Sequence, residues 1–232
     1  MFMNPLFWLF ALPGLLLGLY AQSRIKSNFD KYSQVRTADN ITGAQAARAL
    51  LDSQGLQDIV IEPTPGVLTD HYDPRGKILR LSQEVYHTPS VAAVGVAAHE
   101  AGHALQDATS YSPLKFRSAI VPVVQFGTSL APWIFIAGFV LGILELAWVG
   151  VFLFALSTLF ALVTLPVEFN ASNRAKKLLV DQGIVTDEAG REGVKRVLGA
   201  AAWTYVAAAV SSVGNLIYYI FLLSGSSRRR YR

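Results

Sequence analysis

The chain contains 232 residues, enough for one modest domain together with membrane segments, and its 52% hydrophobic and 16% charged residues shift its composition toward that of membrane proteins. The formal net charge of +4 is mild and the basic residues lie close to apolar segments, so we exclude nucleic acid as a partner and interpret these charges as flanking a lipid bilayer. The absence of cysteine excludes disulfide bonds and thiolate metal ligands.

The first predicted element is an uncharged apolar stretch over residues 5–21. Such a stretch is typical of either a cleaved secretory signal or an uncleaved membrane anchor. No basic residue precedes it, whereas a signal peptide normally begins with a positively charged segment. We therefore favour an uncleaved N-terminal membrane anchor, comprising residues 1–22.

Residues 23–117 have the patterns of a small α/β-like segment. Thr42 and Ser90 are both suited to cap the N-terminus of a helix, and Gly55 is suited to end one. Pro63 and the Pro65-Gly66 pair indicate a turn. The expected elements, in order, are a helix over residues 42–54, a strand over 58–62, a strand over 77–82 and a helix that begins after Ser90.

Two further apolar stretches, residues 119–140 and 146–166, are separated only by the charge of Glu145. Each has the length of about 20 residues that a membrane crossing needs, so they predict a transmembrane hairpin over residues 118–166 with a tight turn near Glu145. A new helical run opens at Val167, and we assign residues 167–197 to this helix and to the loop and helix that follow.

The last apolar stretch, residues 198–223, belongs to a C-terminal segment over residues 198–232 that ends in a basic tail. Its second half is bulky and typical of a membrane helix. Its first half is rich in small residues, so it could instead pack within a soluble domain. The sequence leaves these two alternatives open.

The basic residues predict how the chain is oriented, because they favour the cytoplasmic side of a membrane. Several follow the first apolar stretch and none precedes it, which predicts an external N-terminus and a cytoplasmic segment 23–117. The Arg-rich tail disagrees, since four complete crossings would place it outside. Either the fourth stretch does not cross fully or the tail is an exception. We expect a multi-pass protein of the cell (plasma) membrane with its catalytic side in the cytoplasm.

The most informative motif is His99-Glu100-Ala101-Gly102-His103, which reads H-E-x-x-H. Two histidines four residues apart on a helix differ by about 40° around its axis, so both imidazoles lie on one face and can bind one Zn²⁺. Glu100 then lies beside the metal, where it can accept a proton from water. The alternative is a packing helix with two incidental histidines. The motif uses two of only four histidines, which favours the metal site.

A catalytic zinc usually has three protein ligands, so a third must come from elsewhere. His71 and His87 both precede the motif, and His87 fits a surface loop better than a catalytic position. Glu168 lies two residues after Pro166, at the end of the third apolar stretch. From residue type alone, Glu168 is equally well explained as an interfacial charge that ends a membrane helix.

The motif, followed far downstream by Glu168-Phe-Asn-Ala-Ser-Asn-Arg-Ala175, resembles the HtpX-type membrane zinc metallopeptidases, which have a glutamate as third ligand. The chain is more similar still to the bacterial YugP-type zinc metallopeptidases, including over residues 68–75, 91–98 and 204–209. This resemblance implies that His99, His103 and Glu168 bind zinc and that Glu100 is the general base.

Ser172 departs from the HtpX pattern, which has an aspartate at this position. An aspartate there would orient a histidine through a hydrogen bond, and serine would do so only weakly.

The position of Glu168 also predicts where the site lies. At about 1.5 Å rise per helical residue, Glu168 lies within a few ångströms of the apolar boundary. If it binds the metal, the active site lies at the membrane face. We therefore expect an α+β, mainly helical membrane protein with about four apolar helices and a small H-E-x-x-H metallopeptidase domain at the membrane face.

A dense polar cluster, Asp70-His71-Tyr72-Asp73, precedes the strand expected over residues 77–82. In related proteases an edge strand beside the zinc helix pairs with the substrate backbone, and we assign residues 77–81 to this part. His71 or Tyr72 would then donate a hydrogen bond to the developing oxyanion. The simpler alternative is a polar turn that satisfies its own backbone.

Together these patterns predict a zinc-dependent membrane endopeptidase that hydrolyses peptide bonds in membrane-associated or misfolded membrane proteins. Its partners would be a peptide or membrane-protein substrate and the lipid bilayer, and a regulatory membrane partner is left open. The alternative is a non-catalytic membrane scaffold or adaptor that keeps a zinc site only for folding. A metal transporter would need ionisable residues within the apolar stretches, which carry almost none beyond Glu145.

Overall fold

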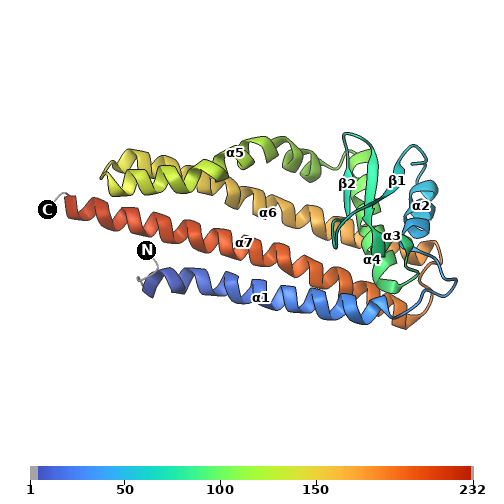
Figure 1. The fold of residues 1–232 in the computed structure, drawn as a ribbon. Helices are drawn as coiled ribbons and strands as arrows, with labels where there is room; N and C mark the ends of the chain where they lie inside the picture. The colour runs from blue at the N-terminus through green and yellow to red at the C-terminus, as the bar shows by residue number, and fades with distance from the viewer. Residues whose placement is uncertain (1–4, 231–232) are drawn as a thin grey trace. The chain divides into compact units, whose positions relative to one another are not determined.

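The computed structural model describes residues 5–230, with side chains as far as residue 225. Figure 1 shows the elements of this part of the chain. In order they are α1 (Pro5–Ser33), α2 (Gly43–Ser53), β1 (Val60–Thr64), β2 (His71–Asp73), β3 (Ile78–Ser82), α3 (Gln83–His87), α4 (Val91–Ala108), α5 (Ser112–Val140), α6 (Leu144–Asp181) and α7 (Glu188–Arg230).

The chain divides into two compact units. Four helices, α1, α5, α6 and α7, each contain residues of both units. The first, which we call the helical unit, contains the chain up to Tyr20, Lys115–Pro166 and the chain from Trp203 onward. The second, which we call the mixed unit, contains Ala21–Leu114 and Val167–Ala202 and includes all three described strands.

The sheet of the mixed unit has the strand order β1-β3-β2 (Figure 1). β1 pairs with β3 in parallel, and β2 pairs with β3 antiparallel. This order corrects the expectation that residues 77–81 form an edge strand that is open to substrate. β3 is the central strand, and its backbone groups on both sides are already used by its neighbours.

Two turn predictions in this region are also wrong. The polar cluster does not form a turn, because His71–Asp73 is the strand β2. Pro63 does not begin a turn either, because it lies within β1 and is paired with Leu81. A proline cannot donate a ladder hydrogen bond, but β1 lies at an edge of the sheet, where that loss is tolerated.

Helix α2 begins and ends, and α4 begins, close to the residues that the sequence predicts. Thr42 Oγ1 accepts a hydrogen bond from the Gln45 N–H at 3.3 Å, while Gln45 Oε1 accepts one from the Thr42 N–H at 2.9 Å. Ser90 Oγ caps α4 by accepting from the Ala93 N–H at 3.2 Å. Gly55 follows α2 with a φ of 74°, a conformation that glycine adopts without strain.

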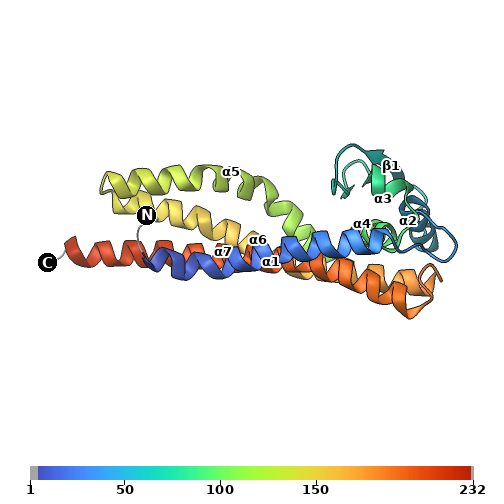
Figure 2. The same cartoon turned by 60° about the horizontal axis from the view of Figure 1, so that its bottom comes forward.

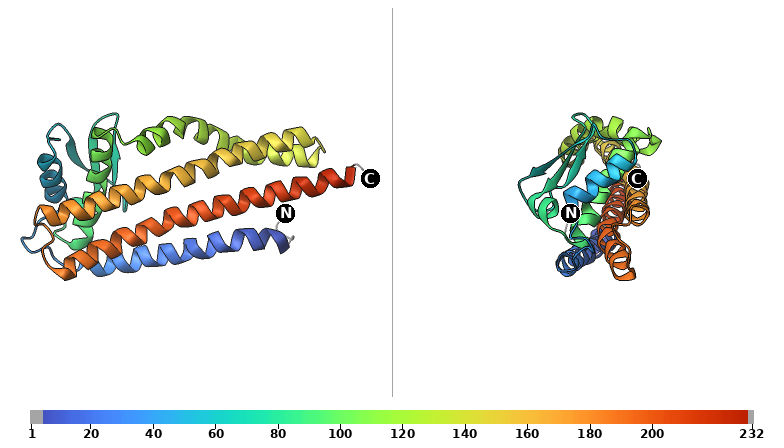
Figure 3. Two further views of the ribbon diagram at one scale, coloured as in Figure 1. Left: turned by 180° about the vertical axis from the view of Figure 1, so that it is seen from behind. Right: turned by 90° about the vertical axis from the view of Figure 1, so that its right-hand side faces the viewer.

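The core of the mixed unit forms around α4, whose many alanines let its neighbours pack closely. Helices α2 and α3 and strand β3 contribute larger apolar side chains. Figure 3 shows the ribbon of these elements from two further sides. The C-terminal part of α6 and the first part of α7 complete the same core. Fully buried members include Leu50, Leu51, Leu79, Leu81, Val85 and Val94.

In the helical unit, α5 and α6 form an antiparallel hairpin (Figure 2). The connection falls at residues 141–143, where Gly142 has a φ of 69°. The turn therefore lies near Glu145, as predicted. Glu145 lies in the first turn of α6, where the positive end of the helix dipole favours an acidic side chain.

The apolar helices are longer than the sequence patterns predict. α1 continues to Ser33, and α6 runs without a break through Pro166 to Asp181. The predicted start of a new helix at Val167 is therefore wrong. Proline removes one backbone hydrogen bond, and the turns on either side of Pro166 remain helical.

Within residues 5–230, four helices are long and apolar enough to cross a membrane. They are α1, α5, α6 and α7, the last of them as far as Gly225. With its single small sheet, the chain is therefore a mainly helical α+β membrane protein, as predicted.

Because β3 is central, its buried side chains should matter more to stability than those of the edge strand. Leu81 in β3 has 0% exposure, whereas Val60 in β1 is 55% exposed. We expect Leu81→Ala to lower the free energy of unfolding by about 2–5 kcal/mol and Val60→Ala to lower it by less than about 1 kcal/mol. Unfolding of the purified protein in detergent measures both, and equal effects would contradict this fold.

Candidate metal centre

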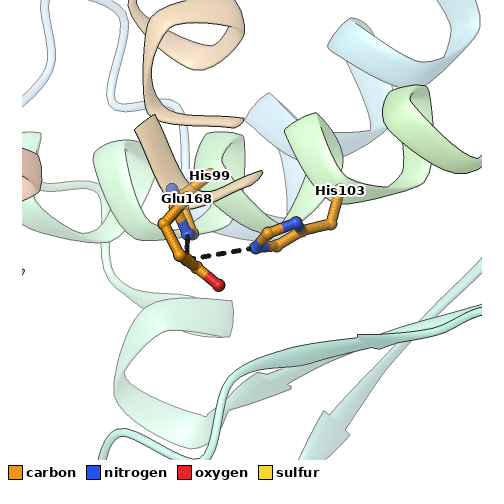
Figure 4. Close-up of side chains that lie close together, drawn as sticks. All are labelled: His99, His103 and Glu168. Carbon is orange, nitrogen blue, oxygen red and sulfur yellow. Dashed lines mark hydrogen bonds and ion pairs between the residues drawn. The ribbon is translucent and has the colours of Figure 1, made fainter. Parts of the chain in front are cut away.

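Three side chains from two helices of the mixed unit meet at one point (Figure 4). His99 and His103 lie one turn apart on α4, with ring centroids separated by 4.8 Å. Glu168 comes from α6, 69 residues after His99. Its Oε2 lies 3.2 Å from His99 Nε2 and 3.5 Å from His103 Nε2.

These distances fit one metal ion held by all three residues. Each residue offers one ligand atom, and the three atoms lie within 4.8 Å of one another. A tetrahedral zinc ion with bonds of about 2.0–2.2 Å holds its ligand atoms roughly 3.3–3.6 Å apart. Two imidazole nitrogens and a carboxylate oxygen are also a donor set of catalytic rather than structural zinc sites. The structure thus brings together the three residues that the resemblance assigns to zinc.

The site is shielded from water and carries negative charge. The side chains of His99 and His103 are 12% and 13% exposed, and that of Glu168 is 4% exposed. Burial by itself lowers the pKa of His103, but its hydrogen bond with Glu168 and the charge of Glu100 raise the pKa above its ordinary value. The same charges attract a metal cation, so protons and metal compete for this position.

Glu100 lies between the two histidines on α4 and is only 9% exposed. Its charge is one of the causes that raise the pKa of His103. A proton acceptor beside a metal-activated water needs this combination of burial and proximity.

Each imidazole has a further partner at its Nδ1 atom. Ser172 Oγ lies 3.1 Å from His99 Nδ1, so Ser172 contacts the histidine from the position where the HtpX pattern has aspartate. Gln106 Oε1 lies 3.0 Å from His103 Nδ1. The sequence analysis missed Gln106 because it lies in the small, apolar flank of the motif. A signal was present, since a polar residue three positions after a histidine shares its helix face.

A family model described as "Putative neutral zinc metallopeptidase" matches residues 7–224. The chain belongs to this family. It is also 46% identical over 217 residues to the "Putative membrane protease YugP" of Bacillus subtilis (strain 168). The aligned region covers 94% of this chain and 96% of that protein. No solved structure matches the chain. The resemblance to YugP-type metallopeptidases is therefore confirmed, and the family identifies zinc as the metal that the site is built for.

The two residues predicted to bind the oxyanion lie on β2. His71 is exposed, and its Nδ1 lies 2.8 Å from the carbonyl oxygen of Thr69. The Tyr72 hydroxyl donates a hydrogen bond to Asp107 Oδ2 on α4 at 3.0 Å. Burial and Asp107 together raise the pKa of Tyr72 above its ordinary value. Tyr72 thus lies beside the helix that carries the histidines, while His71 points to its own loop.

The two aspartates of the polar cluster serve the sheet itself. Asp70 Oδ1 accepts a hydrogen bond from the Ser82 N–H at 2.8 Å, and burial raises the pKa of Asp70. Asp73 Oδ1 accepts one from the Arg75 N–H at 2.9 Å. The cluster therefore satisfies nearby backbone groups, as the alternative interpretation held, from a residue just before β2 and from the last residue of β2.

His87 lies at the C-terminal end of α3, against the ring of Tyr86. Among the described residues, it does not belong to the group that could hold a metal ion.

The close approach of α4 and α6 depends on Gly102, the glycine of the H-E-x-x-H motif. A Cβ atom at this position would lie 2.7 Å from the carbonyl oxygen of Ala171. Because that oxygen belongs to the backbone of α6, it cannot rotate away as a side chain could. Gly102 therefore lets α6 come near enough to α4 for Glu168 to reach the two imidazoles.

We expect Gly102→Ala to separate the helices at the site and to weaken zinc binding by about 10-fold or more, the scale of losses when metal ligands lose their support. Competition with a chromophoric chelator measures this. Gly95→Ala is the matched control. Gly95 lies on the same helix, and the nearest atom to a Cβ at this position is Cγ2 of Val194, at 3.8 Å. Unchanged zinc affinity in Gly102→Ala would contradict the role of this contact.

Proposed function

We propose that this protein is an integral membrane zinc endopeptidase that cleaves membrane proteins or segments emerging from the bilayer. The observation that carries the proposal is the meeting of His99, His103 and Glu168, with an acidic residue between the histidines. Membership of a zinc metallopeptidase family and the similarity to a protein named as a membrane protease support it.

Each residue of the site has a distinct task. His99, His103 and Glu168 hold the zinc ion, which supplies the Lewis acidity that activates water and polarises the scissile carbonyl group. Glu100 is the general base: its carboxylate takes a proton from the attacking water and delivers it to the nitrogen of the leaving amine. The burial of Glu100 suits this task, because few water molecules compete for its carboxylate. Ser172 orients His99 through the contact at Nδ1.

The outer edge of β2 is our candidate for binding the substrate backbone. Among the described strands, β2 pairs only with β3, and Tyr72 connects it to α4 through Asp107. A peptide that adds to this edge as a further strand would run beside the helix that carries the histidines. Tyr72 and exposed His71 are then the two candidate donors to the oxyanion, and the Tyr72 hydroxyl would serve by exchanging its hydrogen bond to Asp107 for one to the oxyanion.

We also propose that the site faces the cytoplasm at the membrane surface. α6 contains both the apolar stretch that ends at Pro166 and, two residues later, Glu168. In this scheme a cytoplasmic catalytic segment, residues 23–117, lies between the anchor 1–22 and the hairpin 118–166. Residues 167–197 then contribute the third ligand from the same side, and residues 198–232 form the last span and tail.

The roles of the site residues predict separate losses of metal and activity. We expect Glu100→Gln to keep zinc but to lose cleavage of a fluorescently labelled unfolded substrate such as casein, because an amide cannot accept the proton. His99→Ala should lose both zinc and cleavage. Metal analysis and a cleavage assay on the purified protein measure these effects, and a chelator should stop cleavage by the wild type.

Two exposed positions on α3 provide the controls, Glu84→Gln for the base and His87→Ala for the ligand. Both should keep zinc and activity. An active Glu100→Gln variant or a metal-free wild type would reject this mechanism. A wild type that binds zinc but cleaves neither unfolded nor membrane-derived substrates would favour the scaffold or adaptor instead.

The orientation can be tested by single-cysteine labelling, because the chain has no cysteine of its own. Leu141 lies in the α5–α6 turn and Gln57 in the mixed unit, and both are exposed. We expect a membrane-impermeant maleimide to label Leu141→Cys in intact cells, and Gln57→Cys only after the membrane is permeabilised. The reverse pattern would place the catalytic side outside the cell.

A further inference from the structure

Gln106 lies at the centre of a hydrogen-bond network between α4 and α6. Its side chain has 0% exposure, and both ends of its amide have partners. Oε1 lies 3.0 Å from His103 Nδ1, while Nε2 donates to the carbonyl oxygen of Val167 at 2.8 Å and to Asn170 Oδ1 at 3.0 Å. One buried amide thus contacts both a proposed zinc ligand and the helix that carries another.

These partners determine which end of the amide is oxygen. The carbonyl oxygen of Val167 can only accept a hydrogen bond, so the end of Gln106 that faces it must be the NH₂ group. Arg174 Nε, which can only donate, lies 2.9 Å from Asn170 Oδ1 and therefore identifies that atom as an oxygen too. Both partners on α6 need a donor, so the amide oxygen of Gln106 is left facing His103.

An oxygen at this position determines the tautomer of His103. Nδ1 must carry the proton of the neutral imidazole, and the lone pair of Nε2 is then directed toward Glu168 Oε2, 3.5 Å away. The contact at His99 is different, because the Ser172 hydroxyl can either donate to Nδ1 or accept from it. Gln106 is therefore more selective than Ser172 in the tautomer that it allows.

The same amide also binds α6 through two residues close to Glu168. Val167 directly precedes Glu168 in the chain, and Asn170 follows it by two residues. A displacement of α6 along α4 would break both hydrogen bonds and leave buried polar groups without partners, which is unfavourable. The position of the Glu168 carboxylate is thereby tied to that of His103.

We propose that Gln106 is a positioning residue that keeps Nε2 of His103 unprotonated and available to the metal, and that sets Glu168 opposite it. This inference rests on the proposed zinc site and extends it to a residue that binds neither metal nor substrate. Outer partners of this kind typically change metal affinity by 10–100-fold.

The zinc affinity of the full-length protein in detergent, measured by competition with a chromophoric chelator, tests the proposal. Gln106→Leu removes every hydrogen bond of the amide and should weaken zinc binding by about 10–100-fold. Gln106→Glu keeps an oxygen acceptor for His103 Nδ1 but loses the donors to Val167 and Asn170. We expect Gln106→Glu to bind zinc more tightly than Gln106→Leu does.

The comparison of the two variants separates positioning from simple structural support. If Gln106 only tied the helices together, the glutamate would place negative charge against two oxygen atoms and would bind zinc no better than the leucine variant. That result would overturn the proposal. Thr109→Val is the matched control, because it removes hydrogen bonds to the backbone carbonyl oxygens of Leu105 and Gln106 but leaves the side-chain amide of Gln106 with its partners. It should leave zinc affinity unchanged.

A second measurement needs no folded variant at position 106. In ¹⁵N NMR spectra of the zinc-loaded wild type labelled at its four histidines, His103 should carry its proton on Nδ1. The His103 signals are assigned by their absence in His103→Gln. A proton on Nε2 of His103 would overturn the proposal.

The outcomes also distinguish this inference from the proposed function. A wild type that binds no zinc rejects the metal site itself. A wild type that binds zinc, together with a Gln106→Leu variant of equal affinity, rejects only the role of Gln106.

Discussion

The metal centre depends on one steric condition: the backbones of α4 and α6 lie almost in contact at Gly102 and Ala171. A glutamate side chain is short, so its carboxylate reaches two imidazoles on another helix only if the helices approach this closely. Ala98 and Ala101 of α4 are also small and fully buried. The residues that bear chemistry and the residues that permit the approach are therefore interleaved within the same two turns of helix.

Close approach alone would not make a stable site, because it buries charge. Glu168 retains 4% side-chain exposure, and an ionised carboxylate at such a position is costly unless it is paired. Its two imidazole partners provide that pairing, and a divalent cation provides it more strongly. Gln106 and Ser172 in turn engage the far sides of the imidazoles, so each ring is held from both sides. The buried carboxylate is therefore paired with the imidazoles, and each imidazole has a hydrogen-bond partner of its own.

The helical unit accounts for the composition of the chain. Large apolar side chains such as Phe126 and Trp133 on α5 are 71% and 73% exposed, which would be unfavourable over so much of a water-soluble surface. Lipid accommodates them, and the backbone groups of these long helices are satisfied within each helix, as a bilayer requires. Because α6 continues without a break from its apolar stretch to Glu168, one helix contains both the candidate membrane span and a proposed zinc ligand.

The features that could be predicted from the sequence are those that depend on neighbouring residues. A helix repeats every 3.6 residues, so the spacing of His99 and His103 places both imidazoles on one face whatever surrounds them. The caps at Thr42 and Ser90 and the apolar spans are local in the same sense. Glu168 is different, since residue type alone explained it equally well as an interfacial charge, and only the family resemblance assigned it to the metal.

The tertiary structure decided the contacts between segments that are far apart in the chain. The central position of β3 and the partners of Gln106 on α6 across 61 and 64 residues differ from, or add to, the sequence-based expectations. Local spacing cannot encode them, because which strands pair and which helix faces touch depends on the packing of the whole unit. The motif itself determined that a metal could bind, and the packing of α6 against α4 determined with which carboxylate and in which orientation.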